Sequence, residues 1–296
     1  MISSLQRKLI ISFLSLIVLL IIYLIPTNIN YQETSTYIDV KKNSVYLLNN
    51  DLLVQTEVIS NKDDINDKIL EIIDTLTING SKKNYINEEF TPVIPANTKV
   101  LDLELKDKLL KINFSKEFNN ADIKAIESLV YSLTELEEVD SIMLFVEGVK
   151  IDKIGDKIIP NVLNRDFGIN KVYDITTLNN VYKATMYYYV NINDNFNVVP
   201  VTLFTNDNVN KVEIIVEKLK SAPIYQSNLM SFLADNAKLL DYEIEENKIR
   251  LEFENALLDN FFESELLEEV KYAISETLKS TIGVSEITFV LDNKEI

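Results

Sequence analysis

The sequence predicts an α+β protein in which an N-terminal transmembrane helix is followed by two tandem two-layer α/β sandwich domains, each with the order ββαββαβ. Three observations support this fold class. The stretch 95–118 recurs without a gap at 234–257, so the chain contains the same unit twice. Both copies alternate apolar and polar residues, which indicates β-hairpins. An uninterrupted apolar run also lies near the N-terminus, at 9–25.

The apolar run 9–25 carries no charge and, at about 1.5 Å per residue, is just long enough for a bilayer core of about 30 Å. Arg7 and Lys8 precede it, so the positive-inside rule places the N-terminus in the cytoplasm. No small-x-small cleavage site follows, which favours an uncleaved signal anchor over a cleaved signal peptide. We therefore predict a single-pass protein of the cell membrane, with extracytoplasmic domains after an anchor at 1–26 and a tether at 27–44.

The first repeat is predicted to span 45–151. Its stretches at 45–48 and 52–58 have the composition of short strands, and its helices are marked by apolar residues at helical spacing. Asp63 and Asp64 are suited to begin the first helix, and Asn79–Gly80 to end it. The remaining elements follow in order: the hairpin at 101–114, a second helix at 123–133 and a closing strand at 142–146.

The second repeat is predicted to span 184–296 on the same plan. Its expected elements are strands at 184–190 and 198–204, a helix at 209–219, the second hairpin at 240–253, a helix at 266–278 and a last strand at 287–291. The intervening stretch 152–183 has little periodicity and carries Gly155, Pro160 and Gly168, so we interpret it as the inter-domain linker. Each repeat is long enough to bury its own core, which predicts two domains.

The composition excludes several classes of function. The chain has no Cys, His or Trp and a net charge of −17. Without His or Cys it has no Ser-His-Asp triad, thiolate zinc site, iron–sulfur cluster, disulfide or lipidated cysteine. Its five glycines form no phosphate-binding loop, and its acidity disfavours binding to nucleic acid. We therefore predict no catalytic, cofactor-binding or metal-binding residue.

The first hairpin and its flanks resemble the GerMN domain of GerM-like sporulation and germination proteins. The resemblance rests on Ile94–Lys99 before the hairpin, Ile112–Phe118 at its end, and Leu133–Leu136 after the following helix. The family usually has glycine where this chain has Asn97 and Asn236, and asparagine is the next best residue for a left-handed turn.

This resemblance implies a non-enzymatic protein of the bacterial envelope that helps a sporulation or germination complex to assemble. The implied partners are envelope or sporulation-channel proteins. Because GerMN domains are similar to ring-building folds, a homo-oligomer is also compatible with the resemblance. Combined with the predicted anchor, it favours a membrane-anchored scaffold that binds other proteins and needs no cofactor.

Two other functions stay open at this stage. One is a wall-glycan hydrolase that uses paired carboxylates, with candidates on one strand face of the second hairpin: Glu243, Glu245, Glu252 and Glu254. In so acidic a chain, a solvated sheet face explains these residues more simply. The other is a small-molecule-binding envelope protein whose ligand lies between the domains, where Tyr187, Tyr188 and Tyr189 could line a crevice. Strand alternation sends Tyr188 to the opposite face from its neighbours.

Overall fold

The computed structural model describes residues 13–17, 41–82, 84, 86–221, 228–233, 235–254, 264–291 and 294–296. The chain divides into two compact units, Met1–Asp39 and Val40–Ile296, and the second contains both repeats. Residues 13–17 are helical. The rest of the predicted anchor at 9–25 and most of the tether lie outside the described residues. In the described part of the chain, no helix has both the length and the apolar character that a membrane crossing requires.

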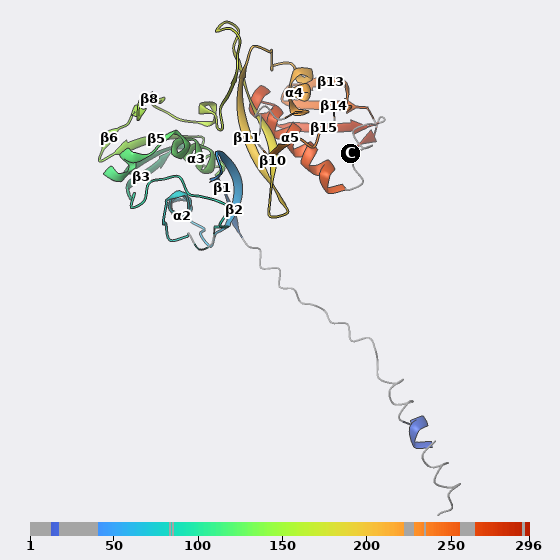
Figure 1. Cartoon of the computed structure of the whole chain (residues 1–296), viewed down its shortest axis with the longest axis horizontal. Helices are drawn as coiled ribbons and strands as arrows, with labels where there is room; N and C mark the ends of the chain where they lie inside the picture. The colour runs from blue at the N-terminus through green and yellow to red at the C-terminus, as the bar shows by residue number, and fades with distance from the viewer. Residues whose placement is uncertain are drawn as a thin grey trace, which may run out of the picture. The chain divides into compact units, whose positions relative to one another are not determined.

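The first repeat has the predicted order of elements, ββαββαβ, with short additions (Figure 1). Its elements are β1 (Lys42–Asn49), β2 (Leu52–Ile59), α2 (Ile65–Leu76), β3 (Val100–Lys106), β4 (Leu109–Phe114), the 3₁₀ turn η2 (Lys116–Asn120), α3 (Ile123–Leu133), β5 (Ser141–Val146) and β6 (Val149–Lys150). Helix α2 begins where predicted, because the Asp64 carboxylate accepts the backbone N–H groups of Asn66 and Asp67. Asn97 has a φ of 65°, the left-handed conformation expected at that turn.

The second repeat follows the same order. Its elements are β9 (Val172–Asp174), β10 (Tyr182–Ile192), β11 (Asn195–Thr205), α4 (Val212–Leu219), β12 (Leu229–Met230), β13 (Leu239–Glu245), β14 (Lys248–Phe253), α5 (Ser264–Ile282), β15 (Glu286–Leu291) and β16 (Lys294–Glu295). Between the repeats lie the two-stranded β7 (Lys153–Ile154) and β8 (Lys157–Ile158) and the 3₁₀ turn η3 (Arg165–Phe167). Ile154, Ile159 and Leu163 of this segment are buried in the core.

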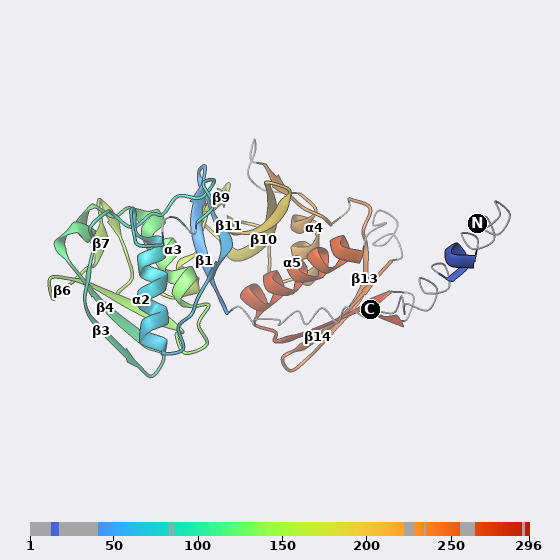
Figure 2. The same ribbon diagram turned by 90° about the horizontal axis from the view of Figure 1, so that it is seen from below.

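The predicted two-layer arrangement is wrong, because the strands of each repeat form two separate sheets. In the first repeat the β1–β2 hairpin is one sheet and β3-β4-β5-β6 is the other, and in the second they are β12-β10-β11-β9 and β13-β14-β15-β16. The helices lie between the two sheets of their repeat (Figure 2). Helix α3 is accordingly buried at every residue from Ala125 to Leu133. Period-two alternation shows which faces of a strand are buried but not which strands pair, so the sequence could not separate one sheet from two.

Both outer sheets are built alike. The hairpins β3–β4 and β13–β14 are antiparallel, and a parallel strand, β5 or β15, follows each after a helix. In both hairpins the register shifts by one residue, at Leu101 in the first repeat and at Leu240 in the second. These bulged leucines are 50% and 58% exposed and belong to β3 and β13, which end their sheets. The bulge is therefore a feature of both copies.

A helix closes the free edge of β1 in the first repeat. The hydroxyl of Ser128 in α3 donates to the carbonyl of Tyr46 at 2.5 Å, and the N–H of Tyr46 donates to the hydroxyl of Ser132 at 2.9 Å. Ser128 and Ser132 are fully buried, and they lie on the same side of the helix because they are one turn apart. Both polar groups of a buried strand edge are thus satisfied without another strand.

The second repeat closes the edge of β10 in the same manner. The N–H of Tyr187 donates to the Thr277 hydroxyl at 3.2 Å, and the Ser280 hydroxyl donates to the carbonyl of Thr185 at 3.0 Å. Both hydroxyls belong to α5, the helix that corresponds to α3. The two repeats therefore share this contact although the residues differ.

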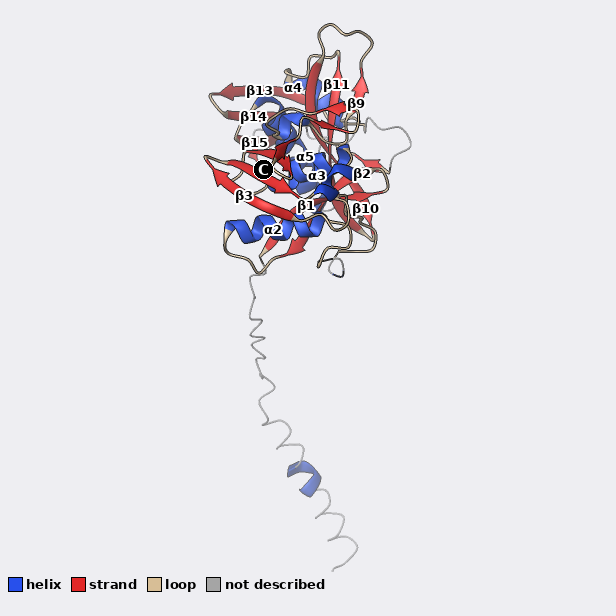
Figure 3. Ribbon diagram, turned by 90° about the vertical axis from the view of Figure 1, so that its left-hand side faces the viewer, coloured by secondary structure: helices blue, strands red, loops and turns tan. Residues whose placement is uncertain are grey.

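The β1–β2 and β10–β11 hairpins lie next to each other in the middle of the unit Val40–Ile296 (Figures 1 and 2). Figure 3 shows the same unit with its strands in red and its helices in blue. Every residue from Ala184 to Val190 in β10 is buried. Tyr188 donates its hydroxyl to the carbonyl of Lys218 at 3.0 Å, and Tyr189 donates to the carbonyl of Glu269 at 2.9 Å. Neither face of this strand is left to solvent, which alternation alone would not predict.

Candidate functional site

The two repeats are joined through the side chain of Asn170. Its Oδ1 accepts the N–H of Leu53 at 2.9 Å, and its Nδ2 donates to the carbonyls of Leu53 at 2.8 Å and of Pro200 at 2.9 Å. The amide thus pairs with β2 as a neighbouring strand would, and also with β11 of the second repeat. Asn170 is buried and has a φ of 47°, a conformation that asparagine tolerates better than most residues. The segment between the repeats is therefore part of the interface between them, which we call the junction.

A buried carboxylate supports Asn170. Glu127 of α3 accepts the N–H of Asn170 at 3.1 Å and lies 3.4 Å from the ammonium of Lys171 and 4.0 Å from that of Lys124. Lys124 also donates to the Oδ1 of Asn170 at 3.0 Å. Burial lowers the pKa of both lysines, although the charge of Glu127 acts in the opposite direction. Two cations around one buried anion satisfy the carboxylate, so this cluster fixes the junction.

A second polar contact at the junction is made by Arg165 of η3. Its guanidinium donates to the Thr134 hydroxyl at 2.9 Å and to the Glu135 carboxylate at 2.5 Å, and lies 5.1 Å from the ring centre of Tyr131. The Tyr46 hydroxyl donates to the same carboxylate at 2.8 Å. Burial alone would lower the pKa of Arg165, but Glu135 and Tyr46 outweigh it and the pKa is raised. The arginine is held as a fixed cation.

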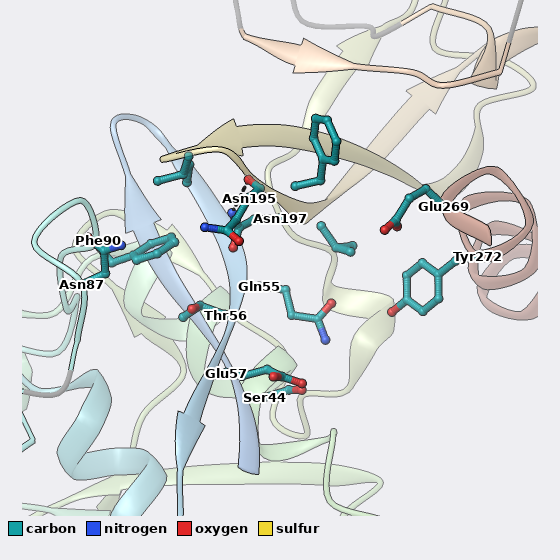
Figure 4. Close-up of a pocket in the computed structure, with 13 residues that line it drawn as sticks. Ser44, Gln55, Thr56, Glu57, Asn87, Phe90, Asn195, Asn197, Glu269 and Tyr272 are labelled. Atoms are coloured by element: carbon teal, nitrogen blue, oxygen red, sulfur yellow. Dashed lines mark hydrogen bonds between the residues drawn. The ribbon is translucent and has the colours of Figure 1, made fainter. Parts of the chain in front are cut away.

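A pocket of about 540 Å³ is lined by residues of both repeats (Figure 4). Its walls come from β1 and β2, the 87–90 loop, the β10–β11 turn and α5. The lining residues are Ser44, Gln55, Thr56, Glu57, Asn87, Phe90, Ile192, Asn195, Phe196, Asn197, Val198, Glu269 and Tyr272. The volume lies within the range of about 300–1,000 Å³ that is common for small-molecule sites. The junction therefore contains a concave site of ligand size.

The three consecutive tyrosines contribute little to the junction pockets. Tyr187 lines a second pocket of about 370 Å³ together with Arg165, while Tyr188 and Tyr189 line neither this pocket nor the larger one. Burial raises the pKa of all three hydroxyls. The tyrosine that lines the larger pocket is instead Tyr272, whose ring meets that of Tyr187 edge to face, with the ring centres 6.5 Å apart. The tyrosines of β10 are mainly core residues.

The four carboxylates considered for glycan hydrolysis do not line the two junction pockets. They are Glu243, Glu245, Glu252 and Glu254. Across the strand pair, Arg250 lies opposite Glu243 and 3.3 Å from Glu252, and Lys238 lies 3.7 Å from Glu254. This arrangement is that of a solvated sheet face. Over the described part of the chain, no group of three or more acidic side chains is placed to hold a metal ion.

Sequence reasoning missed the residues that matter most at the junction. Asn170 bonds to residues distant in the chain, so no local periodicity reveals it. Gly168 was interpreted as a linker glycine. In the structure it lies against Thr202, and a Cβ at this position would come within 2.9 Å of the Thr202 side chain. Gln55 lies in a stretch predicted only as a short strand, and no local pattern indicates that its Oε1 is buried without a hydrogen bond.

Comparisons with known proteins agree with this architecture. Residues 44–152 match the family model Germane, described as sporulation and spore germination. A search of curated proteins gave no match. A structure of the tandem GerMN domains of the sporulation protein GerM from Bacillus subtilis is similar to this chain, with a TM-score of 0.76 and 23% identity, and covers 86% of this chain and 92% of that one. At this identity the likeness is one of fold.

Two shorter structures also match parts of the chain. The first GerMN domain of GerM from Bacillus subtilis is 22% identical, with a TM-score of 0.40, over 43% of this chain and 98% of that one. A lipoprotein structure from Clostridium perfringens is 21% identical, with a TM-score of 0.29, over 43% of this chain and 89% of that one.

Proposed function

We propose that the chain is a GerM-like sporulation and germination protein with tandem GerMN domains, and that it acts as a membrane-anchored extracytoplasmic scaffold for envelope or sporulation-channel proteins. The apolar run 9–25 would hold it in the membrane, with the cations Arg7 and Lys8 on the cytoplasmic side. The scaffold role is non-enzymatic and requires no cofactor.

The observation that carries this proposal is the fixed junction between two similar outer sheets. Asn170 and its partners tie β2 to β11, so the two repeats move together, and a scaffold needs such fixed spacing between its binding surfaces. Strands β3 and β13 end these sheets and carry the exposed leucines Leu101 and Leu240. Exposed edge strands are surfaces on which proteins commonly pair. We assign the partner contacts to these two edges.

Co-purification tests the proposal. The tagged full chain is recovered from membranes of growing and of sporulating cells, and the proteins that accompany it are identified by mass spectrometry. We expect envelope or channel proteins to accompany it during sporulation, and the double variant Leu101→Glu, Leu240→Glu to reduce their recovery several-fold.

Ile158→Glu is the matched control, because Ile158 is 87% exposed on β8, outside both edges, and its change should leave recovery intact. Recovery of no envelope protein from either culture would contradict the scaffold. Equal recovery with the double variant would contradict the assignment to the two edges.

The membrane topology has its own test. Protease added to intact protoplasts should digest the repeats while sparing a tag placed before Arg7. Protection of the repeats, with digestion only after lysis, would reverse the proposed orientation.

A further inference from the structure

We propose that the junction pocket binds a ligand bearing a primary ammonium group. This goes beyond a scaffold function, because it assigns a small-ligand site to the space between β2, the β10–β11 turn and α5. The argument starts from the hydrogen-bonding and charge state of the residues that line the pocket.

The pocket holds one acceptor without a hydrogen bond and one carboxylate without a cation. The Oε1 of Gln55 is buried and has no hydrogen bond. The carboxylate of Glu269 interacts with the hydroxyl of Tyr189 but forms no ion pair with any other described residue, whereas its neighbour Glu268 is paired with Lys271 at 3.0 Å. Figure 4 shows Gln55 of β2 extending toward Glu269 and Tyr272 of α5. A buried acceptor without a donor is destabilising, so a ligand that brings a donor to Gln55 and a positive charge to Glu269 would gain from both contacts.

The charge of the lining selects a cation. The described lining contains two carboxylates, Glu57 and Glu269, and no lysine or arginine. Glu57 is neutralised by Lys42 at 2.5 Å, which leaves Glu269 as the uncompensated charge. An anionic ligand would meet this negative charge without a compensating cation. An ammonium group would instead complete an ion pair and supply three N–H donors.

The remaining lining suits the body of such a ligand. Phe90, Phe196 and Tyr272 contribute aromatic rings, which attract a nearby cation and cover its hydrocarbon chain. Asn195 and Asn197, on the β10–β11 turn, present amides that can bond to peptide or hydroxyl groups. The chemistry therefore fits an aliphatic amine with polar groups at its other end, such as a lysine side chain of a peptide or a free diamine.

Calorimetric titration of the full chain tests this inference with three probes. They are Nα-acetyl-lysine methylamide, 1,5-diaminopentane, and Nα-acetyl-norleucine methylamide, which lacks the ammonium group. We expect the lysine compound to bind with a Kd on the order of 1 mM or below and the norleucine compound at least about tenfold more weakly. Tighter binding of the lysine compound than of the diamine assigns the site to peptides, and the reverse order assigns it to free amines.

Two variants localise the binding to the pocket. Glu269→Gln should weaken the lysine probe about tenfold, and Gln55→Leu should weaken it several-fold. Glu268→Gln is the control, since Glu268 is on the same helix but does not line this pocket, and it should bind as the unmodified chain does. Unchanged thermal unfolding would establish that each variant is folded.

Three results would overturn the inference. They are the absence of binding at about 10 mM probe, where a 1 mM site would be close to saturated, equal binding of the norleucine compound, and an unchanged affinity in a folded Glu269→Gln variant. Should that variant not fold, NMR of the unmodified chain decides the question. The lysine probe should shift the side-chain amide signals of Gln55, and unshifted signals would overturn the inference.

Discussion

The two repeats solve one structural problem with different residues. In the first, two serines of α3 reach the N–H and the carbonyl of a single residue, Tyr46. In the second, a threonine and a serine of α5 reach the N–H of Tyr187 and the carbonyl of Thr185. Hydroxyls can donate and accept, so either pattern satisfies the edge. In both copies, hydroxyl groups of a helix satisfy the backbone of a buried strand edge, but the residues that provide these hydroxyls differ.

The comparison between the repeats does not extend to the junction, because a single residue, Asn170, forms hydrogen bonds with both repeats. Asn170→Ala should have the largest effect on stability, since it leaves three buried backbone groups without their partner, at about 1–3 kcal/mol each. We expect the free energy of unfolding in urea to fall by at least about 3 kcal/mol, and the two repeats to unfold in separate transitions.

Asn193→Ala is the control for Asn170→Ala. Asn193 also has a positive φ, 52°, but it is exposed in the β10–β11 turn, so it reports backbone strain without the bridging bonds. A loss in Asn193→Ala as large as in Asn170→Ala would show that strain, and not the bridge, explains the effect.

The edge closures can be compared directly. The double variant Ser128→Ala, Ser132→Ala removes both partners of Tyr46, and Thr277→Val, Ser280→Ala removes those of Tyr187 and Thr185. Each should lower the unfolding free energy by about 2–4 kcal/mol, because two buried backbone groups lose their bonds. Urea denaturation measures both, and a cost below about 0.5 kcal/mol in either repeat would show that its edge reaches water.

A buried carboxylate gives the first repeat an acid-sensitive contact. Burial alone would raise the pKa of Glu71, but Lys82 at 2.8 Å and the hydroxyl of Ser60 outweigh it, and the pKa is lowered. This carboxylate therefore stabilises the fold above its unfolded pKa of about 4.3, and the contribution is lost as the pH falls through the lower, folded value.

Glu71→Gln should lower the unfolding free energy by about 1.5–3 kcal/mol at pH 7 and by progressively less toward pH 3. Denaturation at a series of pH values measures the difference between the two proteins. An undiminished difference at pH 3 would show that packing, and not charge, is responsible. Glu57→Gln, at an exposed ion pair on the β1–β2 hairpin of the same repeat, should change stability by less than about 1 kcal/mol.

The smallest effect concerns how the first helix of each repeat begins. Asp64 caps α2 with its carboxylate, whereas Lys211 at the start of α4 makes no side-chain cap. Asp64→Ala should cost about 1 kcal/mol, and Lys211→Asp should stabilise α4 by about 0.5–1 kcal/mol. Thermal unfolding of the two variants measures both changes, and a destabilising Lys211→Asp would indicate that the lysine has another role.

The order of the elements could be predicted because each depends on neighbours in the chain. The stripe of Ile69, Ile72 and Leu76 and the alternation of Leu110, Ile112 and Phe114 are local patterns, and all six residues are buried as expected. The layers and the junction depend on contacts between residues far apart. No periodicity links Asn170 to Leu53, or Ser132 to Tyr46. In β10, the stretch from Met186 to Val190 contains no charged residue, which is compatible with burial of both faces.

The candidate site was predictable only as a location. A crevice between the domains was one of the open alternatives, and the pocket lies there. Its distinctive residues, Gln55 and Glu269, come from an alternating strand and a helix surface, where polar residues normally mean solvent. That the two residues line one pocket is seen only in the folded chain, because they belong to different repeats.

The position of Asn170 also bears on how such a protein can be inherited. The side chain that seals β2 of the first repeat comes from the segment that leads into the second. A chain reduced to its first repeat would expose the backbone of Leu53 to water or to another molecule. Shuffling of whole repeats between genes would therefore succeed only if the cut preserved this segment, so the heritable unit is the pair together with its connecting residues.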